Sequence, residues 1–258
     1  KMSKYAMTGG ATGIGAAIKS QLKEAGHEVF VVDLKNADCD ADLSTAEGRS
    51  QAVAAIEAWA QDGLDGFIPC AGLGPAARPV SLITRVNYFA AVEMTRALRP
   101  LVVKRKGAIV LISSNSAPMP VGDDNYVTQL LDGDEAGACD AVDALGDAHT
   151  AYAGSKKALS YWMREQSITA DYAGAGVRMN AVAPGLTMTP LTDAAFKDEA
   201  VGQAMQDFAA TVPLGQPGQP EQIASVVCFL LSQAANNMVG SVVFVDGGHD
   251  AMLRPREF

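Results

Sequence analysis

Short apolar runs alternate with helical segments along almost the whole chain of 258 residues. The runs at 29–32 and 108–112 are rich in Val and Ile and contain no polar residue, which is typical of strands buried on both faces of a sheet. Strands that alternate with helices form a parallel sheet with right-handed crossovers. We therefore predict an α/β fold, a single-domain doubly wound parallel sheet of the Rossmann-like type, over residues 1–258. The expected strands are 5–7, 29–32, 66–68, 108–112, 177–182 and 242–245, and the expected helices are 16–24, 46–60, 90–103, 152–172 and 222–231.

Two stretches interrupt this alternation. Residues 115–150 are rich in Asp and are expected to form an acidic insertion with short helices, for which a solvated cover is the alternative interpretation. Residues 186–211 follow the Pro184-Gly185 break and mix apolar with polar side chains, which favours either a lid over a substrate pocket or a plain pair of surface helices. The candidate substrate contacts in the second stretch, for which a place in the core is an equal alternative, are Met188, Leu191, Phe196, Met205 and Phe208.

A glycine-rich turn follows the first expected strand, with the spacing T-G-x-x-x-G-x-G over residues 8–15. Glycines there let a pyrophosphate approach the backbone, and the helix behind them offers free N–H groups at its N-terminus. A glycine cluster alone is often only a turn, but its place between a strand and a helix favours dinucleotide binding. The expected contacts of the cofactor in this turn are Gly9, Thr12, Gly13, Ile14 and Gly15.

Two aspartates stand where they can select the dinucleotide. Asp33 ends the second expected strand, where a carboxylate accepts hydrogen bonds from ribose hydroxyls and repels a 2′-phosphate. We therefore predict NAD rather than NADP, although Lys35 lies close enough to weaken the preference. Asp42, followed by Leu43, is a candidate for contact with adenine, and helix capping ahead of Ala46 is the alternative.

Composition excludes several other classes of function. The net charge of −9 and the pI of about 4.8 argue against nucleic acid as a partner, because binding phosphates needs clustered Lys and Arg. The Cys and His residues lack the spacing of a zinc site or a disulfide framework, so we expect no metal and free thiols. No apolar stretch is long enough to cross a membrane. We also expect no signal peptide, and therefore a cytoplasmic location.

Tyr152 and Lys156 stand one helical turn apart, with Ser113 and Ser114 upstream in the sequence. A phenol, an ammonium and a hydroxyl can together pass a proton to or from a carbonyl oxygen. A free tyrosine titrates near pH 10, and a neighbouring ammonium favours the phenolate. We therefore predict that Tyr152 is the acid/base and that Lys156 lowers its pKa. The alternative for such a pair is a half-buried Tyr with a Lys whose stem covers it.

In this order and combination the motifs resemble the short-chain dehydrogenase/reductase family over almost the whole chain. The resemblance depends on the glycine turn and on the segments 70–72, 86–87, 113–114, 152–156, 184–185 and 246–248. Cys70-Ala71-Gly72 departs from the commoner Asn-Asn-Ala-Gly of the family, which removes contacts of the central strand but not the chemistry.

The resemblance implies further roles for particular residues. Ser114, which closes the Ile-Ser-Ser run, would bind the reacting oxygen, and Asn87 would hold a water that links Lys156 to solvent. Lys156 would also bind the nicotinamide ribose. The further cofactor contacts that the resemblance implies are Ala71, Gly72, Tyr152, Pro184, Gly185, Thr187 and Thr189, with helix capping as the alternative for the two threonines.

Within the family, the chain resembles the bacterial 3α-hydroxysteroid dehydrogenase/carbonyl reductases, and coniferyl-alcohol dehydrogenases are similar in the same places. The resemblance implies an NAD-dependent enzyme acting on a bulky apolar alcohol or ketone, a hydroxysteroid first. A function of another class, a dinucleotide-sensing regulator without catalysis, is disfavoured because Ser114, Tyr152 and Lys156 are all present. The family also implies a homodimer.

Overall fold

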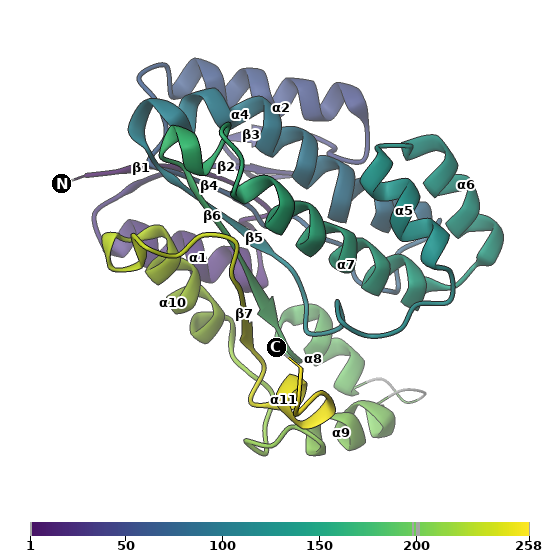
Figure 1. Ribbon diagram of the computed structural model, residues 1–258. Helices are drawn as coiled ribbons and strands as arrows, with labels where there is room; N and C mark the ends of the chain where they lie inside the picture. The colour runs from purple at the N-terminus through teal and green to yellow at the C-terminus, as the bar shows by residue number, and fades with distance from the viewer. Residues whose placement is uncertain (1, 198, 200–201, 258) are drawn as a thin grey trace.

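A parallel sheet lies at the centre of the molecule, for which the computed structural model describes residues 2–197, 199 and 202–257 (Figure 1). Within these residues seven strands are hydrogen-bonded in the order β3-β2-β1-β4-β5-β6-β7, and every pair is parallel. The predicted fold class is therefore confirmed. The strands are β1 Lys4–Thr8, β2 Glu28–Asp33, β3 Cys39–Asp40, β4 Gly66–Pro69, β5 Ala108–Ile112, β6 Arg178–Pro184 and β7 Val242–Val245.

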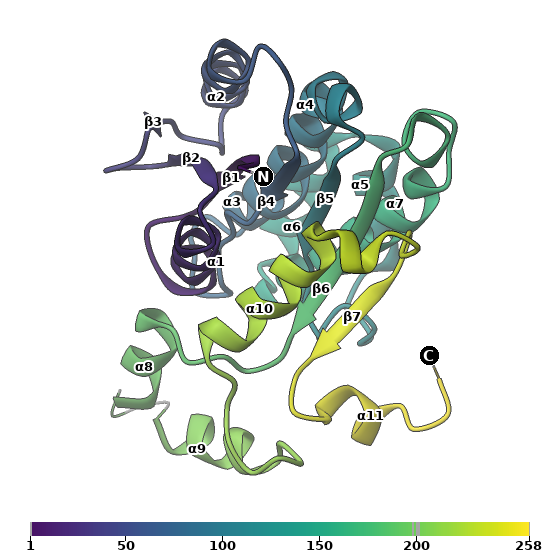
Figure 2. The ribbon, with the colours of Figure 1, turned by 90° about the vertical axis from the view of Figure 1, so that its left-hand side faces the viewer.

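Helices cover both faces of the sheet. Figures 1 and 2 show α2, α4 and α7 on one face and α1 and α10 on the other. Each face has its own cluster of buried apolar side chains, so the sheet is buried on both sides, as its continuous apolar strands require. The helices are α1 Gly13–Glu24, α2 Ala46–Trp59, α3 Ser81–Thr84, α4 Ala91–Arg105, α5 Asp124–Asp132, α6 Glu135–Leu145, α7 Ala148–Ser167, α8 Pro190–Lys197, α9 Gly202–Ala210, α10 Pro220–Leu231 and α11 His249–Leu253, with short turns η1 Arg85–Ala90, η2 Ala173–Ala175 and η3 Gln233–Ala235.

Helix α7 is displaced along the sequence relative to the predicted helix at 152–172. It starts a turn earlier because the side chain of Asp147 caps it by accepting a hydrogen bond from the backbone N–H of His149. It ends at Ser167, where the Thr169 hydroxyl donates to the carbonyl of Gln166 and closes a local turn. The earlier start matters because Tyr152, the first residue of the predicted helix, lies in the second turn of the observed one.

The acidic insertion forms α5 and α6, which pack beside α7 (Figure 1). Tyr126, Leu130 and Val142 are fully buried and belong to the same core cluster as the residues of α7. Most of its aspartates are exposed on the other side. The insertion is therefore solvated on one side only, and its apolar side is part of the core.

The second interruption forms α8 and α9, which lie with α11 beyond the carboxyl ends of β6 and β7 (Figure 1). Met188, Phe196 and Met205 are half-buried and Phe208 is 47% exposed, so these side chains do not belong to the core. The side chain of Leu191 lies outside the described set.

No helix in the described part of the chain combines the length and hydropathy needed to cross a membrane. The cytoplasmic location stays a prediction.

Candidate active site

The predicted site residues lie at the carboxyl ends of the strands, around the switch point of the sheet. The strand order runs outward in opposite directions from the neighbours β1 and β4, and ligands of such sheets bind beyond the carboxyl ends of the strands at this point. The glycine turn follows β1, Asp33 ends β2, and the segment at 70–72 follows β4. Ser114 comes shortly after β5, and Pro184 is the last residue of β6, with Gly185 directly after it.

The turn after β1 is built from glycines because the space and the backbone angles require them. Gly9 and Gly13 have φ angles of +74° and +57°, which side chains rarely adopt. A Cβ on Gly9 would lie 2.6 Å from the Cα of Ala71, and a Cβ on Gly15 would strike the carbonyl oxygen of Gly9. Thr12 precedes α1 but its side chain makes no capping bond, so the first N–H groups of α1 are left for an anion. The turn therefore fits a dinucleotide's pyrophosphate.

The two predicted aspartates lie beside this turn and at the next strand end. Asp33 accepts a hydrogen bond from the N–H of Ala11 at 3.0 Å, which brings its carboxylate against the glycine turn. The Oδ1 atom of Asp42 accepts from the N–H and the hydroxyl of Ser44, at 2.9 and 2.7 Å. The side chain that caps α2 is that of Thr45, so Asp42 is not used as the cap.

Lys156 is buried on the inner face of α7. Its side chain is 6% exposed, and its ammonium donates to the carbonyl oxygen of Ile112, at the end of β5, at 2.7 Å. Burial lowers the pKa of Lys156 to about 8, and the neighbouring Cys70 acts in the opposite direction. The ammonium is thus held at the carboxyl end of β5, and Lys156 lies one helical turn from the predicted acid/base.

Tyr152 is half-buried and interacts with Ser114. Burial raises the pKa of Tyr152, and a hydrogen bond with Ser114 opposes this shift. Lys156, which we predict to lower this pKa, donates to the Ile112 carbonyl, and its effect on Tyr152 stays a prediction. Ser113 is directed elsewhere, because its hydroxyl is 2.7 Å from that of Ser160.

Asn87 lies in the π-helical turn η1, a feature that is common at functional sites. Its side-chain amide exchanges two hydrogen bonds with the backbone of Leu73, at 2.7 and 3.0 Å. A Cβ on Gly72 would lie 3.5 Å from the Asn87 Oδ1 and 3.8 Å from the Lys156 Nζ. The structure therefore brings Asn87, Gly72 and Lys156 together. The side-chain oxygen of Asn87 and the ammonium of Lys156 both border the space that Gly72 leaves free by having no side chain.

The segment after β6 closes against the glycine turn. A Cβ on Gly13 would lie 3.2 Å from the side chain of Thr189, so the start of the segment 186–211 faces the glycine turn. The Thr189 hydroxyl also accepts a bond from the N–H of Thr192 at 3.3 Å, as its capping alternative expects. Thr187 is buried and donates to the carbonyl of Gly185 at 2.9 Å.

Three further residues, for which the sequence predicts no role in the site, border it. Cys70 lies beside Lys156, and burial raises the pKa of its thiol to about 12, against the effect of that lysine. Asn115, next to Ser114, has its amide nitrogen 3.5 Å from the Asp246 carboxylate. Gly185 lies beside this contact, because a Cβ there would be 2.6 Å from that of Asp246. The sequence signal for Asp246 was its Asp-Gly-Gly motif, which had been given no role.

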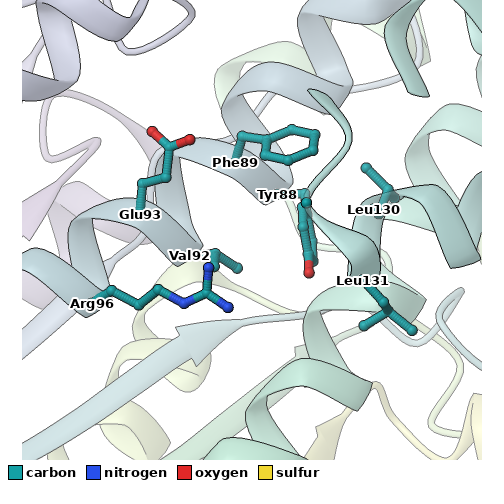
Figure 3. A pocket seen from close by; sticks show the side chains of 8 residues that line it. Tyr88, Phe89, Val92, Glu93, Arg96, Leu130 and Leu131 are labelled. Atoms are coloured by element: carbon teal, nitrogen blue, oxygen red, sulfur yellow. The ribbon is translucent and has the colours of Figure 1, made fainter. Parts of the chain in front are cut away.

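Two hollows in the described surface lie away from these residues. One of about 70 Å³ lies between α4 and α5, where Tyr88, Arg96 and Leu131 line it (Figure 3). The other, of about 360 Å³, lies between α2 and α4. None of the predicted site residues lines either hollow. The described residues also contain no cluster of His, Cys, Asp and Glu that would hold a metal ion.

Two family models match the chain in succession. The model described as short chain dehydrogenase matches residues 4–125, and the one described as enoyl-(acyl carrier protein) reductase matches residues 138–250. The gap between them falls inside the acidic insertion.

Individual proteins match over the full length. The chain is 41% identical to the 3-alpha-hydroxysteroid dehydrogenase/carbonyl reductase of Comamonas testosteroni, over 100% of both chains. It is 29% identical to the galactitol 2-dehydrogenase of Rhizobium johnstonii, over 94% of this chain and 93% of that one. The crystal structure of the 3-alpha-hydroxysteroid dehydrogenase from Pseudomonas sp. B-0831, complexed with NADH, superimposes with a TM-score of 0.93 at 41% identity, covering 99% of this chain and 100% of the other.

Proposed function

Because the chain belongs to the short-chain dehydrogenase/reductase family, we propose that it is an NAD(H)-dependent oxidoreductase that interconverts a secondary alcohol and a ketone. The observation that carries this proposal is that Tyr152 lies beside Ser114, whose side chain lowers its pKa, and one helical turn from Lys156, at the switch point where the glycine turn lies. The NADH complex of the Pseudomonas enzyme supports NAD as the cofactor.

The proposed reaction divides the chemistry between the cofactor and the chain. When bound, the nicotinamide ring supplies hydride transfer. In alcohol oxidation, the Tyr152 phenolate accepts the hydroxyl proton as the hydrogen on carbon leaves as hydride. In ketone reduction, the phenol returns a proton to the oxygen. Ser114 holds that oxygen in place through its hydroxyl, and Lys156, whose ammonium is anchored to the Ile112 carbonyl, adds a positive charge one helical turn from Tyr152.

The cofactor's other contacts follow from the site. Gly9, Gly13 and Gly15 would admit the pyrophosphate to the N-terminus of α1. Asp33, held against this turn, would accept the ribose hydroxyls. A steady-state comparison of NAD with NADP tests this assignment, and we expect a preference for NAD in kcat/KM. A preference for NADP would contradict the role given to Asp33.

For the substrate, we propose a bulky apolar molecule, with a 3α-hydroxysteroid first. The half-buried Met188, Phe196 and Met205 and the exposed Phe208 support it, because these apolar side chains lie in a segment that faces the glycine turn. The steroid activity of both 41% identical relatives supports it as well. The test is turnover of a 3α-hydroxysteroid, its 3β epimer and coniferyl alcohol with NAD. Turnover of coniferyl alcohol alone would overturn the steroid assignment and favour the aromatic-alcohol alternative.

The role of Tyr152 has a direct test. Tyr152→Phe removes the proton carrier, so we expect kcat to fall by about three orders of magnitude while NADH still binds. Tyr161→Phe, on the same helix but 47% exposed, is the matched control and should leave kcat unchanged. Turnover of Tyr152→Phe at the wild-type rate would refute the assigned role. Wild-type protein that binds NADH but oxidises none of the alcohols would favour a dinucleotide-sensing regulator.

We also propose a homodimer. Strand β7 is the last strand of the sheet, and all four of its apolar residues, Val242–Val245, are only half-buried. Phe229 on α10 is 43% exposed. Covering such surfaces is a usual reason for association. Light scattering tests the proposal, and a monomer would refute it.

A further inference from the structure

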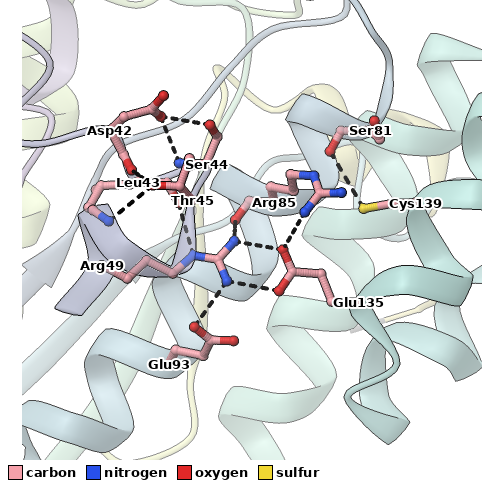
Figure 4. A network of polar contacts seen from close by, with 11 residues as sticks. Asp42, Leu43, Ser44, Thr45, Arg49, Ser81, Arg85, Glu93, Glu135 and Cys139 are labelled. Carbon is pink, nitrogen blue, oxygen red and sulfur yellow. Dashed lines mark hydrogen bonds and ion pairs between the residues drawn. The ribbon is translucent and has the colours of Figure 1, made fainter.

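A buried arginine joins the acidic insertion to the turn that carries Asp42 and Leu43. Arg49 lies in the first turns of α2 and is only 3% exposed. Its Nε donates to the carbonyl oxygen of Leu43 at 2.9 Å. Figure 4 shows its guanidinium between this turn, α4 and α6. The arginine therefore holds the turn from inside the molecule.

The other N–H donors of the Arg49 guanidinium also have acceptors. Glu135, the first residue of α6, accepts from both terminal nitrogens at 2.9 Å each. Glu93 of α4 accepts from Nη1 at 3.0 Å, and the carbonyl of Arg85 accepts from Nη2 at 3.2 Å. A guanidinium has five N–H donors, and here each has an acceptor. Its plane, and with it the position of the Leu43 carbonyl, is therefore fixed from three helical elements.

The charges in this network balance. Arg49 and Arg85 face Glu93 and Glu135, and Arg85 itself bonds Glu135 at 3.1 Å. Burial works against the charge of Arg49, but the hydrogen bond and the charge of Glu135, together with that of Glu93, raise its pKa above the usual value. Removing one carboxylate would leave a buried cation with too few partners, so the network is sensitive to a single change.

We propose that Arg49 is a positioning residue for the adenine half of the dinucleotide, and that Glu135 makes the insertion part of this function. The inference rests on the proposed NAD site, in which Asp42 and Leu43 contact adenine. Neither Arg49 nor Glu135 needs to touch the cofactor. Arg49 fixes the Leu43 carbonyl, and Ser44 fixes the Asp42 carboxylate, so the turn is held in one shape before the ligand arrives. If the turn is loosened, it must be ordered when the dinucleotide binds, and the free energy that this costs weakens the affinity for the dinucleotide.

Glu135→Gln tests the inference, because glutamine keeps the size of the side chain but offers one acceptor and no charge. We expect the dissociation constant of NADH, measured by fluorescence, and the inhibition constant of AMP to rise about threefold to tenfold. The KM for NAD should rise with them, while kcat stays within about twofold. Inhibition by nicotinamide mononucleotide, which lacks the adenine half, should not change. A role in stability alone would move the unfolding temperature without this split between the two halves.

Asp143→Asn is the matched control. Asp143 anchors the same helix α6 elsewhere, because its carboxylate accepts from the N–H of Ser81 at 2.8 Å. We expect this variant to bind AMP as the wild type does. Equal weakening of AMP binding in both variants would overturn the inference, since the insertion would then act by general packing. Wild-type affinity for AMP in Glu135→Gln would overturn it as well.

Arg49→Lys provides an independent variant if Glu135→Gln does not fold. Lysine keeps the charge but lacks the planar fork, so the contacts to Leu43 and Glu135 cannot all be made. We expect the same selective loss of AMP affinity. If the wild type binds NADH but both folded variants bind AMP normally, this inference fails alone. If the wild type binds neither AMP nor NADH, the proposed function fails and the inference fails with it.

Discussion

At the scale of single residues, the site separates two serines that are adjacent in sequence. Ser113 bonds Ser160 and is 2% exposed, whereas Ser114 interacts with the phenol of Tyr152. The sequence favours Ser114 only through the resemblance to a family. The hydrogen bonds supply an independent physical reason for the same choice. The Ser113 hydroxyl is committed to Ser160 on the helix behind it, whereas the Ser114 oxygen accepts from the N–H and the hydroxyl of Ser116, at 3.1 and 2.9 Å, which leaves its own O–H to donate.

The effect of Ser114 on the pKa of Tyr152 has a consequence for the dependence of rate on pH. Alcohol oxidation needs the deprotonated phenol, so kcat/KM should rise with pH up to the pKa of Tyr152. Ser114 lowers that pKa, so in Ser114→Ala we expect the rising limb to move to higher pH and the maximal rate to fall about a hundredfold. Initial rates with saturating NAD across the alkaline range measure both. Ser113→Ala is the control, and an identical limb in both variants would contradict the assignment.

Lys156, to which we assign a role in the site, destabilises the fold. Its pKa is about 8 in the folded protein and 10.5 ordinarily, so the unfolded chain holds the proton more tightly. Protonation of Lys156 therefore lowers the free energy of unfolding by its full amount below pH 8, and this penalty disappears as pH rises through 10.5. It amounts to about 3 kcal/mol at pH 7. The hydrogen bond to Ile112 offsets about 1 kcal/mol of this.

We therefore expect Lys156→Met to be inactive but more stable than the wild type. In urea unfolding of the cofactor-free proteins, the gain should be about 2 kcal/mol at pH 7, the difference between the charge penalty and the lost hydrogen bond. The gain should shrink markedly at pH 9.5, because the wild-type lysine is then largely neutral when folded. A gain that does not change with pH would show that packing, and not charge, is responsible.

At the scale of elements, the sequence predicts what depends on local pattern. The runs at 108–112 and 242–245 coincide with β5 and β7, because apolar runs between turn residues mark strands. Of the two, β5 is fully buried, and β7, the last strand of the sheet, is only half-buried. The two-residue β3, the π-helical turn around Asn87 and helix α11 were not predicted, because they are too short for a periodic pattern. The direction of Lys156 toward Ile112 depends on how α7 packs on β5, which no local pattern contains.

Gly154 is one of the points where the insertion contacts α7, the helix that carries Tyr152. A Cβ on it would lie 2.8 Å from two ring carbons of the buried Tyr126 on α5. For Gly154→Ala we expect a loss of stability of about 1–3 kcal/mol from overpacking, reduced by up to about 1 kcal/mol because alanine favours a helix. Activity should fall too, since Tyr152 is two residues away.

A double-mutant cycle with Tyr126→Leu, which removes the ring, provides the control. If the ring is the obstacle, the double variant should lose clearly less stability in urea than the sum of the two single variants. Purely additive losses would mean that the alanine acts through another neighbour.

At the scale of the whole molecule, the two segments that interrupt the α/β alternation differ in how much apolar surface they bury. The insertion buries Tyr126, Leu130 and Val142 in the main core and is joined to α2 and α4 through Arg49. In the second interruption, the buried residues of α9 are Gly202 and Ala209, which are small and contribute little apolar area. The molecule thus combines a rigid support behind the catalytic helix with a loosely held cover in front of the cofactor turn.

Hydrogen exchange can distinguish these two segments in the cofactor-free protein. We expect the amides of α6 to exchange together with those of α7, in the slowest cooperative unit, because both helices share one core. The amides of α8 and α9 should exchange much earlier, because local opening there exposes little apolar surface. Early exchange of α6 would mean that the insertion unfolds as a separate unit, against a single-domain fold. Slow exchange of α9 would mean that it is fixed in place, and its proposed role as a lid would then require a different moving element.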